Sequence, residues 1–356
     1  MSLAWLRSNA VAWSLPRSPS SLAEALADME FVQADPIRFP ARAQDLILRH
    51  RVRGYRVGDL DRNYHALGID EDFVYAYGYT VTRLRPLLHP RRHPRGTDGE
   101  FPHDTRSSEV LEFVRERGVV HPRDLHARFG RRGVVNAWGT TSSATTVALE
   151  ELHRYGLLRV VDRVSGIRRY EVAPAPKPLL DPGRRRRELV LRIARTLAPA
   201  TESTLAATVN RAVRSIGGAT GSVTIGELLA AGELSAITVD GVRYLWPADL
   251  VPTDREPPAR VRFLTPFDPL VWDRQRFGRI WGWDYRFEAY TPAAKRVRGY
   301  YAMPMLWRDR VIGWATCAGR DSEVEVGFAD RVPKGKAFAT ALDAEKHRLK
   351  GFLESR

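Results

Sequence analysis

Gln33 and Asp35 are two polar residues whose types and spacing could do chemistry. They follow the apolar Phe31 and Val32, and they precede Pro36, which disfavours the α-helical conformation for the residue before it. On an extended backbone, residues two apart point to the same side. We therefore expect a carboxylate and an amide on one face, an arrangement that can position and activate a water molecule.

A structural interpretation of the same stretch is also available. Asp35 can cap the helix that we expect over residues 41–53, with Pro36 or Pro40 in the first turn. The apolar side chains of that helix would then face inward. Taken alone, the stretch favours the cap, so the chemical interpretation depends on the rest of the chain.

The charge of the 356-residue chain indicates a polyanionic partner. Lys and Arg number 56 against 42 for Asp and Glu, which leaves a net charge of +14. Such an excess is typical of proteins that neutralise phosphates, most often those of nucleic acids. The first lysine is Lys177, so the early basic residues are arginines, which suit bidentate phosphate contacts. Charge alone leaves DNA, RNA and ribosome binding open.

The sequence lacks the features of membrane-spanning, secreted, disulfide-bonded and metal-binding proteins. No apolar run approaches the ~18 residues needed to span a bilayer, and residues 1–7 do not resemble a signal peptide. The single Cys317 excludes an intramolecular disulfide and a cysteine-rich metal site. His89, His93 and His103 lie among prolines without metal-ligand spacing. We expect a cytoplasmic, nucleoid-associated monomer that uses no metal or cofactor and contacts no membrane.

A pattern of three helices followed by a β-hairpin recurs along the chain. The clearest copy has helices over residues 108–118, 121–130 and 142–156 and strands over 158–163 and 168–172. A second copy begins at residue 184 and ends in strands 234–239 and 242–246, joined by Asp240 and Gly241. Asp-Gly between two β-rich runs is a strong signal for a tight hairpin. Both copies are typical of winged helix-turn-helix domains.

The expected fold class is therefore α+β, with tandem winged helix-turn-helix domains followed by a C-terminal antiparallel β-rich domain, either barrel-like or a curved sheet. The N-terminal domain would carry Gln33, Asp35 and a basic loop in a degenerate winged helix. The C-terminal domain would contain a basic strand over residues 294–306 and a closing helix over 338–353. The expected domains are residues 1–106, 107–180, 181–256 and 257–356.

The basic residues of these domains are candidate phosphate contacts. Five arginines lie between Arg83 and Arg95, next to the aromatic residues of the segment 73–79. Aromatic faces can stack on unstacked bases while arginines hold the backbone. The aromatics of the last domain, Tyr300 among them, are instead expected in its core. The predicted DNA contacts are Arg42, Arg91, Arg92, Arg168, Arg169, Lys295, Arg296 and Arg298.

Several motifs, in order along nearly the whole chain, resemble those of one family. They are Gln33-Ala34-Asp35 ahead of Ala41-Arg42-Ala43, the segment from Ala144 to Leu157, the run from Pro266 to Arg274, and the run from Lys295 to Pro304. Together they resemble the bacterial winged-helix DNA glycosylases that unhook interstrand crosslinks. The resemblance implies tandem winged helices around duplex DNA and excision of N-alkylated purines or crosslinked bases. It also implies that Gln33 and Asp35 are the catalytic pair.

Two departures from the family pattern concern the site. Pro36 stands where members commonly carry a small residue, and Tyr75-Ala76-Tyr77-Gly78-Tyr79 replaces an aromatic-x-His-Glu-Ala segment. The first would stiffen the motif. The second affects the lesion pocket, and therefore the choice of substrate.

The chemistry expected of this pair is hydrolysis. An N7-alkylated purine is cationic and already a good leaving group, so Asp35 would stabilise the oxocarbenium-like sugar and take a proton from a water that Gln33 orients. A lyase would usually need a lysine, and none precedes Lys177. Two alternatives stay open: a winged-helix transcription factor, and a non-catalytic lesion-binding protein in which Asp35 is only a helix cap.

Overall fold

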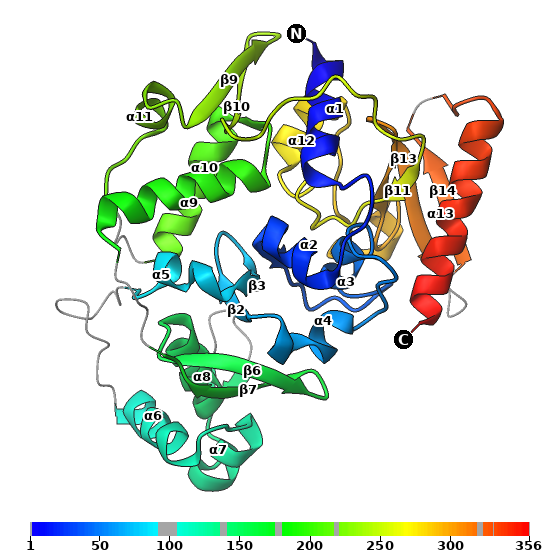
Figure 1. The fold of residues 1–356 in the computed structure, drawn as a ribbon. Coiled ribbons are helices and arrows are strands. Elements are labelled where there is room, and N and C mark those ends of the chain that lie inside the picture. Colours follow the sequence, from blue (N-terminus) through cyan, green and yellow to red (C-terminus); the bar gives the residue numbers. More distant parts are fainter. Residues whose placement is uncertain are drawn as a thin grey trace. The chain divides into compact units, whose positions relative to one another are not determined.

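The protein is represented by a computed structural model that describes residues 2–91, 105–135, 141–174, 180–216, 221–318, 323–329 and 331–355. Figure 1 traces the chain. The chain divides into two compact units. Unit 1 comprises residues 1–59, 189–209 and 223–356, and unit 2 comprises residues 60–188 and 210–222. No helix in the described part of the chain is both long and apolar enough to cross a membrane.

The N-terminal part of unit 1 carries the Gln33–Asp35 pair between short elements. These are α1 (Leu3–Ser14), α2 (Leu22–Met29), β1 (Phe31–Gln33) and α3 (Ala43–Leu48). Ser21 caps α2 in a reciprocal capping box with Glu24. The helix expected over residues 41–53 is shorter than predicted, because after Leu48 the chain tightens into turns in which Arg51 and Val52 both donate to the Leu48 carbonyl.

A three-stranded sheet follows in unit 1, in the order β8-β10-β9. Its strands and the neighbouring helices are β8 (Ala200–Thr201), β9 (Leu234–Val239), β10 (Val242–Pro247), α9 (Pro182–Thr196), α10 (Glu202–Ser215) and α11 (Ile225–Ala230). The division between the units falls within α9 and α10. The predicted β9–β10 hairpin is confirmed, with Asp240 and Gly241 both at positive φ in its turn.

The C-terminal part of unit 1 is an open antiparallel sheet in the order β11-β12-β13-β14. The elements are β11 (Val261–Phe263), α12 (Arg274–Trp281), β12 (Met303–Trp307), β13 (Arg310–Ala318), β14 (Glu323–Phe328) and α13 (Lys336–Glu354). The barrel expectation is wrong: β11 and β14 are edges, and four strands are too few to close. Helix α13 contacts both edge strands (Figure 1, red).

The basic strand expected over residues 294–306 is also wrong for most of its length. Residues Ala293–Lys295 form the 3₁₀ turn η3, and regular strand begins only at Met303. Gly299 lies between them at φ +109°, a conformation that ends any extended run. The segment is therefore a shaped loop.

One hydrophobic core joins the two ends of unit 1. It contains Leu6 and Val11 of α1, Tyr244 of β10, Phe277 of α12 and Leu306 of β12, all essentially buried. Residues from the beginning and the end of the sequence are thus packed into a single body.

Unit 2 contains the predicted order of helix, helix, helix and hairpin. Its elements are α4 (Asp59–Arg62), η1 (Tyr64–Ala66), β2 (Ile69–Phe73), β3 (Tyr77–Val81), η2 (Thr82–Leu84), α5 (Arg85–Leu88), α6 (Thr105–Arg117), α7 (Pro122–Phe129), β4 (Gly133–Val135), β5 (Thr141–Ser143), α8 (Ala144–Arg154), β6 (Leu158–Val164) and β7 (Ile167–Val172). Its core lies between α6, α7, α8 and the β6–β7 hairpin. The β4–β5 hairpin ahead of α8 is an addition that periodicity did not predict.

Candidate active site

Gln33 is the last residue of β1, and Asp35 follows in an irregular segment. The Asp35 Oδ1 atom accepts a hydrogen bond from the Ile37 backbone N–H at 2.9 Å, which closes a local turn around Pro36. The N-cap of α3 is Arg42, and no side chain caps that helix. The helix-cap interpretation of Asp35 is therefore wrong, and its carboxylate serves a turn ahead of the helix.

The surroundings of the pair suit a reacting water. Asp35 is half-buried; burial raises the pKa of its carboxyl, while the Ile37 N–H works in the opposite direction. A carboxylate with a raised pKa is a stronger base. The Gln33 Oε1 atom is buried and has no hydrogen-bond partner among the described residues. An orphaned acceptor close in sequence to a basic carboxylate could accept a hydrogen bond from a water molecule.

The segment that follows the pair is held by buried polar contacts. Asp45 of α3 accepts hydrogen bonds from the Tyr55 hydroxyl at 2.8 Å and from the Gly58 N–H at 3.0 Å. Arg51 makes two hydrogen bonds to Asp268, in the run from Pro266 to Arg274 that resembled the family. This stretch of the family pattern therefore anchors the N-terminal segment to the C-terminal part of unit 1.

Tyrosines from the C-terminal part of unit 1 lie near the Asp35 carboxylate. Burial raises the pKa of Tyr301, and the negative charge of Asp35 adds to that effect. Burial also raises the pKa of Tyr290, and the Asp35 carboxylate is the next largest cause of that rise. Tyr301 is buried with its hydroxyl 2.8 Å from the Thr265 Oγ1, whereas Tyr290 is largely exposed. Asp35 therefore has one buried neighbour, Tyr301, and one exposed neighbour, Tyr290.

Exposed aromatic side chains were missed by the sequence analysis. Tyr300, which we expected in the core, is 38% exposed, and Phe39 and Tyr290 are exposed as well. The centroids of the Phe39 and Tyr300 rings are 6.4 Å apart, although the residues are far apart in the sequence. Tyr300 lies in the run from Lys295 to Pro304 that resembles the family, but neither that motif nor periodicity indicates which rings are exposed, because exposure depends on packing.

The predicted DNA contacts in unit 1 lie near the surface. Lys295 is exposed on η3, and Arg296 lies with its guanidinium 5.1 Å from the centre of the Tyr300 ring. Arg298 is half-buried and lies over the Trp283 ring at 5.0 Å. Arg42 is half-buried at the N-cap of α3. Of these four side chains, Lys295 is the one that the structure leaves exposed.

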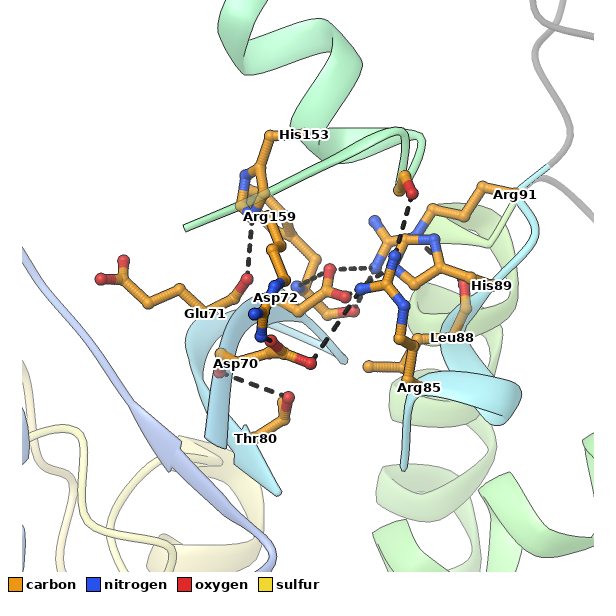
Figure 2. A network of polar contacts seen from close by, with 12 residues as sticks. Asp70, Glu71, Asp72, Thr80, Arg85, Leu88, His89, Arg91, His153 and Arg159 are labelled. Carbon is orange, nitrogen blue, oxygen red and sulfur yellow. Dashed lines mark hydrogen bonds and ion pairs between the residues drawn. The ribbon is translucent and has the colours of Figure 1, made fainter. Parts of the chain in front are cut away.

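Arg91, in unit 2, is not the surface cation that we predicted. It is 3% exposed, and its Nη2 donates to Asp72 Oδ1 at 2.6 Å and to the Phe73 carbonyl at 2.7 Å. Figure 2 shows Asp72 facing both Arg91 and His89, and the His89 Nε2 is 2.6 Å from the Asp72 Oδ2. Burial works to raise the pKa of Asp72, but Arg91 and His89 outweigh it and lower that pKa. Arg91 is an interior residue, and Arg92 lies outside the described residues.

The two wing arginines, Arg168 and Arg169 of β7, are also engaged in ion pairs. Arg168 Nε lies 3.4 Å from the buried Glu71 carboxylate, which also accepts from Arg163 Nε at 2.7 Å. Arg169 Nε donates to Asp162 Oδ1 at 2.6 Å. Both guanidinium groups are partly exposed, so a phosphate would have to compete with these carboxylates.

The acidic run of β2 therefore organises the interior of unit 2. Figure 2 shows Asp70 and Asp72 facing cationic side chains, while the Glu71 side chain points to the opposite side. Asp70 lies 4.0 Å from Arg85 and 3.7 Å from Arg159. Buried charges of this kind are costly unless each is paired, so the run holds the surrounding elements in one arrangement.

The aromatic segment beside this run is also interior. Tyr75 and Tyr79 are buried, and the Tyr79 hydroxyl donates to Asp61 at 2.8 Å. Phe73 and Tyr77 pack on each other with ring centroids 4.8 Å apart. The base stacking predicted for this segment is therefore wrong for Tyr75 and Tyr79, which are committed to the hairpin.

Comparison with known proteins decides the family. The family described as "DNA glycosylase AlkZ-like" matches residues 26–352. The chain belongs to the AlkZ-like DNA glycosylase family. The solved structure of the DNA glycosylase AlkZ from Streptomyces sahachiroi superposes with a TM-score of 0.63 over 99% of this chain and 97% of that chain, at 15% sequence identity. At that identity the superposition establishes a shared mixed helix-and-sheet fold.

Membership of the AlkZ-like family confirms the resemblance carried by the motifs of the sequence. The chain is a DNA glycosylase, and the polyanionic partner indicated by the net charge of +14 is DNA. The matched range includes Gln33 and Asp35 together with the loop that carries Tyr290 and Tyr300.

Proposed function

We propose that this chain is a monofunctional DNA glycosylase that hydrolyses the N-glycosidic bond of alkylated purines of the N7-alkylguanine type and unhooks interstrand crosslinks. Gln33 and Asp35 are the proposed catalytic pair. The observation that carries the proposal is the half-buried Asp35 carboxylate, whose pKa is raised by burial, close in sequence to the orphaned Gln33 acceptor. Groups with perturbed pKa values cluster at functional sites.

The proposed reaction uses the charge of the substrate. The alkylated base is cationic, so the bond between its nitrogen and C1′ of the sugar breaks with the electron pair leaving on the base. Asp35 stabilises the positive charge that develops on the sugar. It then accepts a proton from the water whose oxygen bonds to C1′, while Gln33 orients that water through its amide. The products are the free base and an abasic site.

The monofunctional and metal-independent parts of the proposal rest on the sequence and on the chemistry. A lyase step would usually require an amine nucleophile, and the first lysine of the chain is Lys177. Because the cationic base needs no further activation, neither a metal nor a cofactor is required. Lys295 and the terminal amine are the candidates that a borohydride trapping experiment would reveal as a covalent DNA adduct.

The proposal includes the domain organisation and the DNA contacts. The order α6, α7, α8, β6, β7 supports a winged helix over residues 107–180, and α9, α10, α11, β9, β10 support another over 181–256. The N-terminal domain, 1–106, and the C-terminal domain, 257–356, complete the four. Arg42, Arg168, Arg169, Lys295, Arg296 and Arg298 are proposed to contact phosphates without reading sequence. We propose that the chain acts as a monomer in the cytoplasm, at the nucleoid.

The experiment that tests the function is release of the base from a defined duplex. Wild type and Asp35→Asn are incubated with duplex DNA carrying a single N7-methylguanine, and abasic sites are counted after correction for spontaneous loss. We expect release by wild type and at least a 100-fold lower rate for Asp35→Asn, since the amide cannot take a proton. Asp28→Asn, an exposed change on α2, should match wild type.

The remaining alternatives make different predictions in the same assay. A non-catalytic lesion-binding protein would bind the modified duplex without releasing the base. A transcription factor would in addition prefer one sequence, usually as a symmetric dimer. The proposed activity would be overturned if wild type released neither N7-methylguanine nor a crosslinked base.

A further inference from the structure

Three large aromatic side chains form an exposed cluster near Asp35. Tyr290 is 79% exposed, Tyr300 38% and Phe39 37%, and the apolar Val297 between the two tyrosines in sequence is 78% exposed. Scattered apolar residues are normal on a protein surface, but a group of them marks a binding site. Phe39 and Tyr300 come from distant segments of the sequence, yet their ring centroids lie 6.4 Å apart, so their proximity is a product of folding.

The exposed rings stand on a packed aromatic base. The Tyr290 ring meets the Phe287 ring edge to face, with centroids 6.3 Å apart. The Phe287 ring in turn packs against Phe267 and the buried Tyr301, at centroid distances of 5.5 Å and 5.3 Å. Tyr300 contacts Phe39 at 6.4 Å. A rigid base with open rings above it fits a surface that is formed before its ligand arrives, which limits the entropy lost on binding.

A buried carboxylate fixes the shape of the loop that carries these rings. Glu288 is buried and accepts hydrogen bonds from the backbone N–H groups of Val297 at 3.0 Å, Arg298 at 2.8 Å and Gly299 at 3.2 Å. Burial works to raise the pKa of Glu288, but these three donors outweigh it and lower that pKa, so the carboxylate stays ionised. The loop between residues 288 and 299 is therefore tied at both ends.

The electrostatics of the cluster favour a flat cation. The Asp35 carboxylate is close enough to the Tyr290 phenol to add to the rise in its pKa. The faces of aromatic rings are themselves electron-rich and attract cations. The flat Arg296 guanidinium already lies 5.1 Å from the centre of the Tyr300 ring, so one face of this ring accepts a cation of that shape. Lys295, exposed in the same loop, suits a phosphate. A base with a positive charge, attached to a phosphate backbone, would meet complementary groups at each of these points.

We propose that Phe39, Tyr290 and Tyr300 form a surface that binds the alkylated purine through its positive charge and discriminates it from neutral bases. This inference rests on the proposed function, because it assigns the substrate of the same site. The aromatic faces stack on the cationic ring while Asp35 faces the sugar. An exposed surface of this kind also admits a base that remains tethered to the opposite strand, whereas an enclosed pocket would require the base to leave the duplex.

The test compares two lesions that differ in charge and little in shape. One duplex carries N7-methylguanine on a 2′-fluorinated sugar, which keeps the cation and slows cleavage; the other carries 7-methyl-7-deazaguanine, which is neutral. Dissociation constants are measured for wild type and for Tyr290→Leu, Tyr290→Phe and Tyr300→Leu. Val251→Ala, which removes an exposed apolar side chain elsewhere in unit 1, is the matched control.

We expect wild type and Val251→Ala to bind the cationic duplex roughly 5- to 30-fold more tightly, the ratio that corresponds to about 1–2 kcal/mol of cation–π attraction. Tyr290→Phe keeps the ring and should keep most of the preference. Tyr290→Leu and Tyr300→Leu should each reduce it to about 3-fold or less.

Two results would overturn the inference: equal affinity of wild type for the two duplexes, or an undiminished preference in both leucine variants. Either result leaves the proposed function standing if wild type still releases N7-methylguanine and Asp35→Asn does not. Conversely, an absence of base release would defeat the proposed function while the binding preference is still measured. The two failures are therefore distinguishable.

Discussion

Arg51 and Asp268 are separated by 217 residues in the sequence and form a buried ion pair joined by two hydrogen bonds. Arg51 Nη1 donates to Asp268 Oδ2 at 2.8 Å, and Nη2 donates to Oδ1 at 3.2 Å. Arg51 also donates to the Ile47 carbonyl, at the end of α3. Because α3 follows the Gln33–Asp35 segment, the pair ties the proposed catalytic segment to the run from Pro266 to Arg274.

Breaking this pair should destabilise unit 1 strongly. Asp268→Ala leaves the Arg51 guanidinium buried without its carboxylate, and we expect a loss of about 3–5 kcal/mol in the free energy of unfolding, measured with urea. The double variant Arg51→Met with Asp268→Leu should lose clearly less, because no charge is left unpaired. Asp249→Ala, which removes an exposed partner of Arg195, should cost less than about 1 kcal/mol. Equal losses for the two alanine variants would contradict this account.

The pH dependence of base release should report on Asp35. Burial raises the pKa of this carboxyl above its ordinary value of 3.8, and the base is active only when ionised. The single-turnover rate should therefore be lowest in acid and rise with pH through an inflection above pH 3.8, after the spontaneous rate is subtracted. The residual rate of Asp35→Asn should lack that inflection. If Asp35→Asn kept the same inflection, the titrating group would be a residue other than Asp35.

Binding to undamaged duplex should depend on salt through Lys295. A lysine that contacts one phosphate releases about one counterion, so Lys295→Gln should reduce the slope of log K against log salt by about 1. Lys350→Gln provides a control at an exposed lysine whose Nζ lies 3.9 Å from Glu354 on α13. Titration by fluorescence anisotropy at several salt concentrations gives both slopes. Identical slopes for wild type and Lys295→Gln would remove Lys295 from the contact set.

Unit 2 should lose stability in mild acid because of a buried histidine. Burial lowers the pKa of His153 from 6.5 to about 4, and its Nε2 lies 2.8 Å from the Glu71 carbonyl. Between these pH values the unfolded chain binds a proton that the folded unit does not. The stability is therefore fully present above pH 6.5 and falls toward pH 4, by roughly 3 kcal/mol in total.

Hydrogen exchange of the α8 amides at pH 7 and pH 4.5, corrected for intrinsic rates, measures this loss. His153→Gln keeps a hydrogen-bond donor and removes the titrating ring, so the difference between the two pH values should shrink. His65→Gln, which changes an exposed imidazole of the same unit, should leave that difference as in wild type. The account fails if His153→Gln shows the full wild-type difference.

Local elements were predictable because their signals are local. The hairpin turn at Asp240 and Gly241 needs positive φ at both positions, which this dipeptide tolerates. Helix α7 begins after His121 and ends at Gly130, close to its predicted bounds. The sequence could not decide between a barrel and an open C-terminal sheet, because closure of a barrel depends on strand number and pairing, which no single segment encodes.

The composition and motifs of the sequence were sufficient to identify a DNA partner, the glycosylase family and the Gln33–Asp35 pair as the candidate site. Only the tertiary structure decided that Asp35 serves a turn and caps no helix, that Arg91 is interior, and that Tyr290 is open to solvent. The physical reason is the range of the forces involved. Turn and helix preferences act over a few neighbours, whereas burial and pairing depend on residues brought together from distant segments, as Arg51 and Asp268 are.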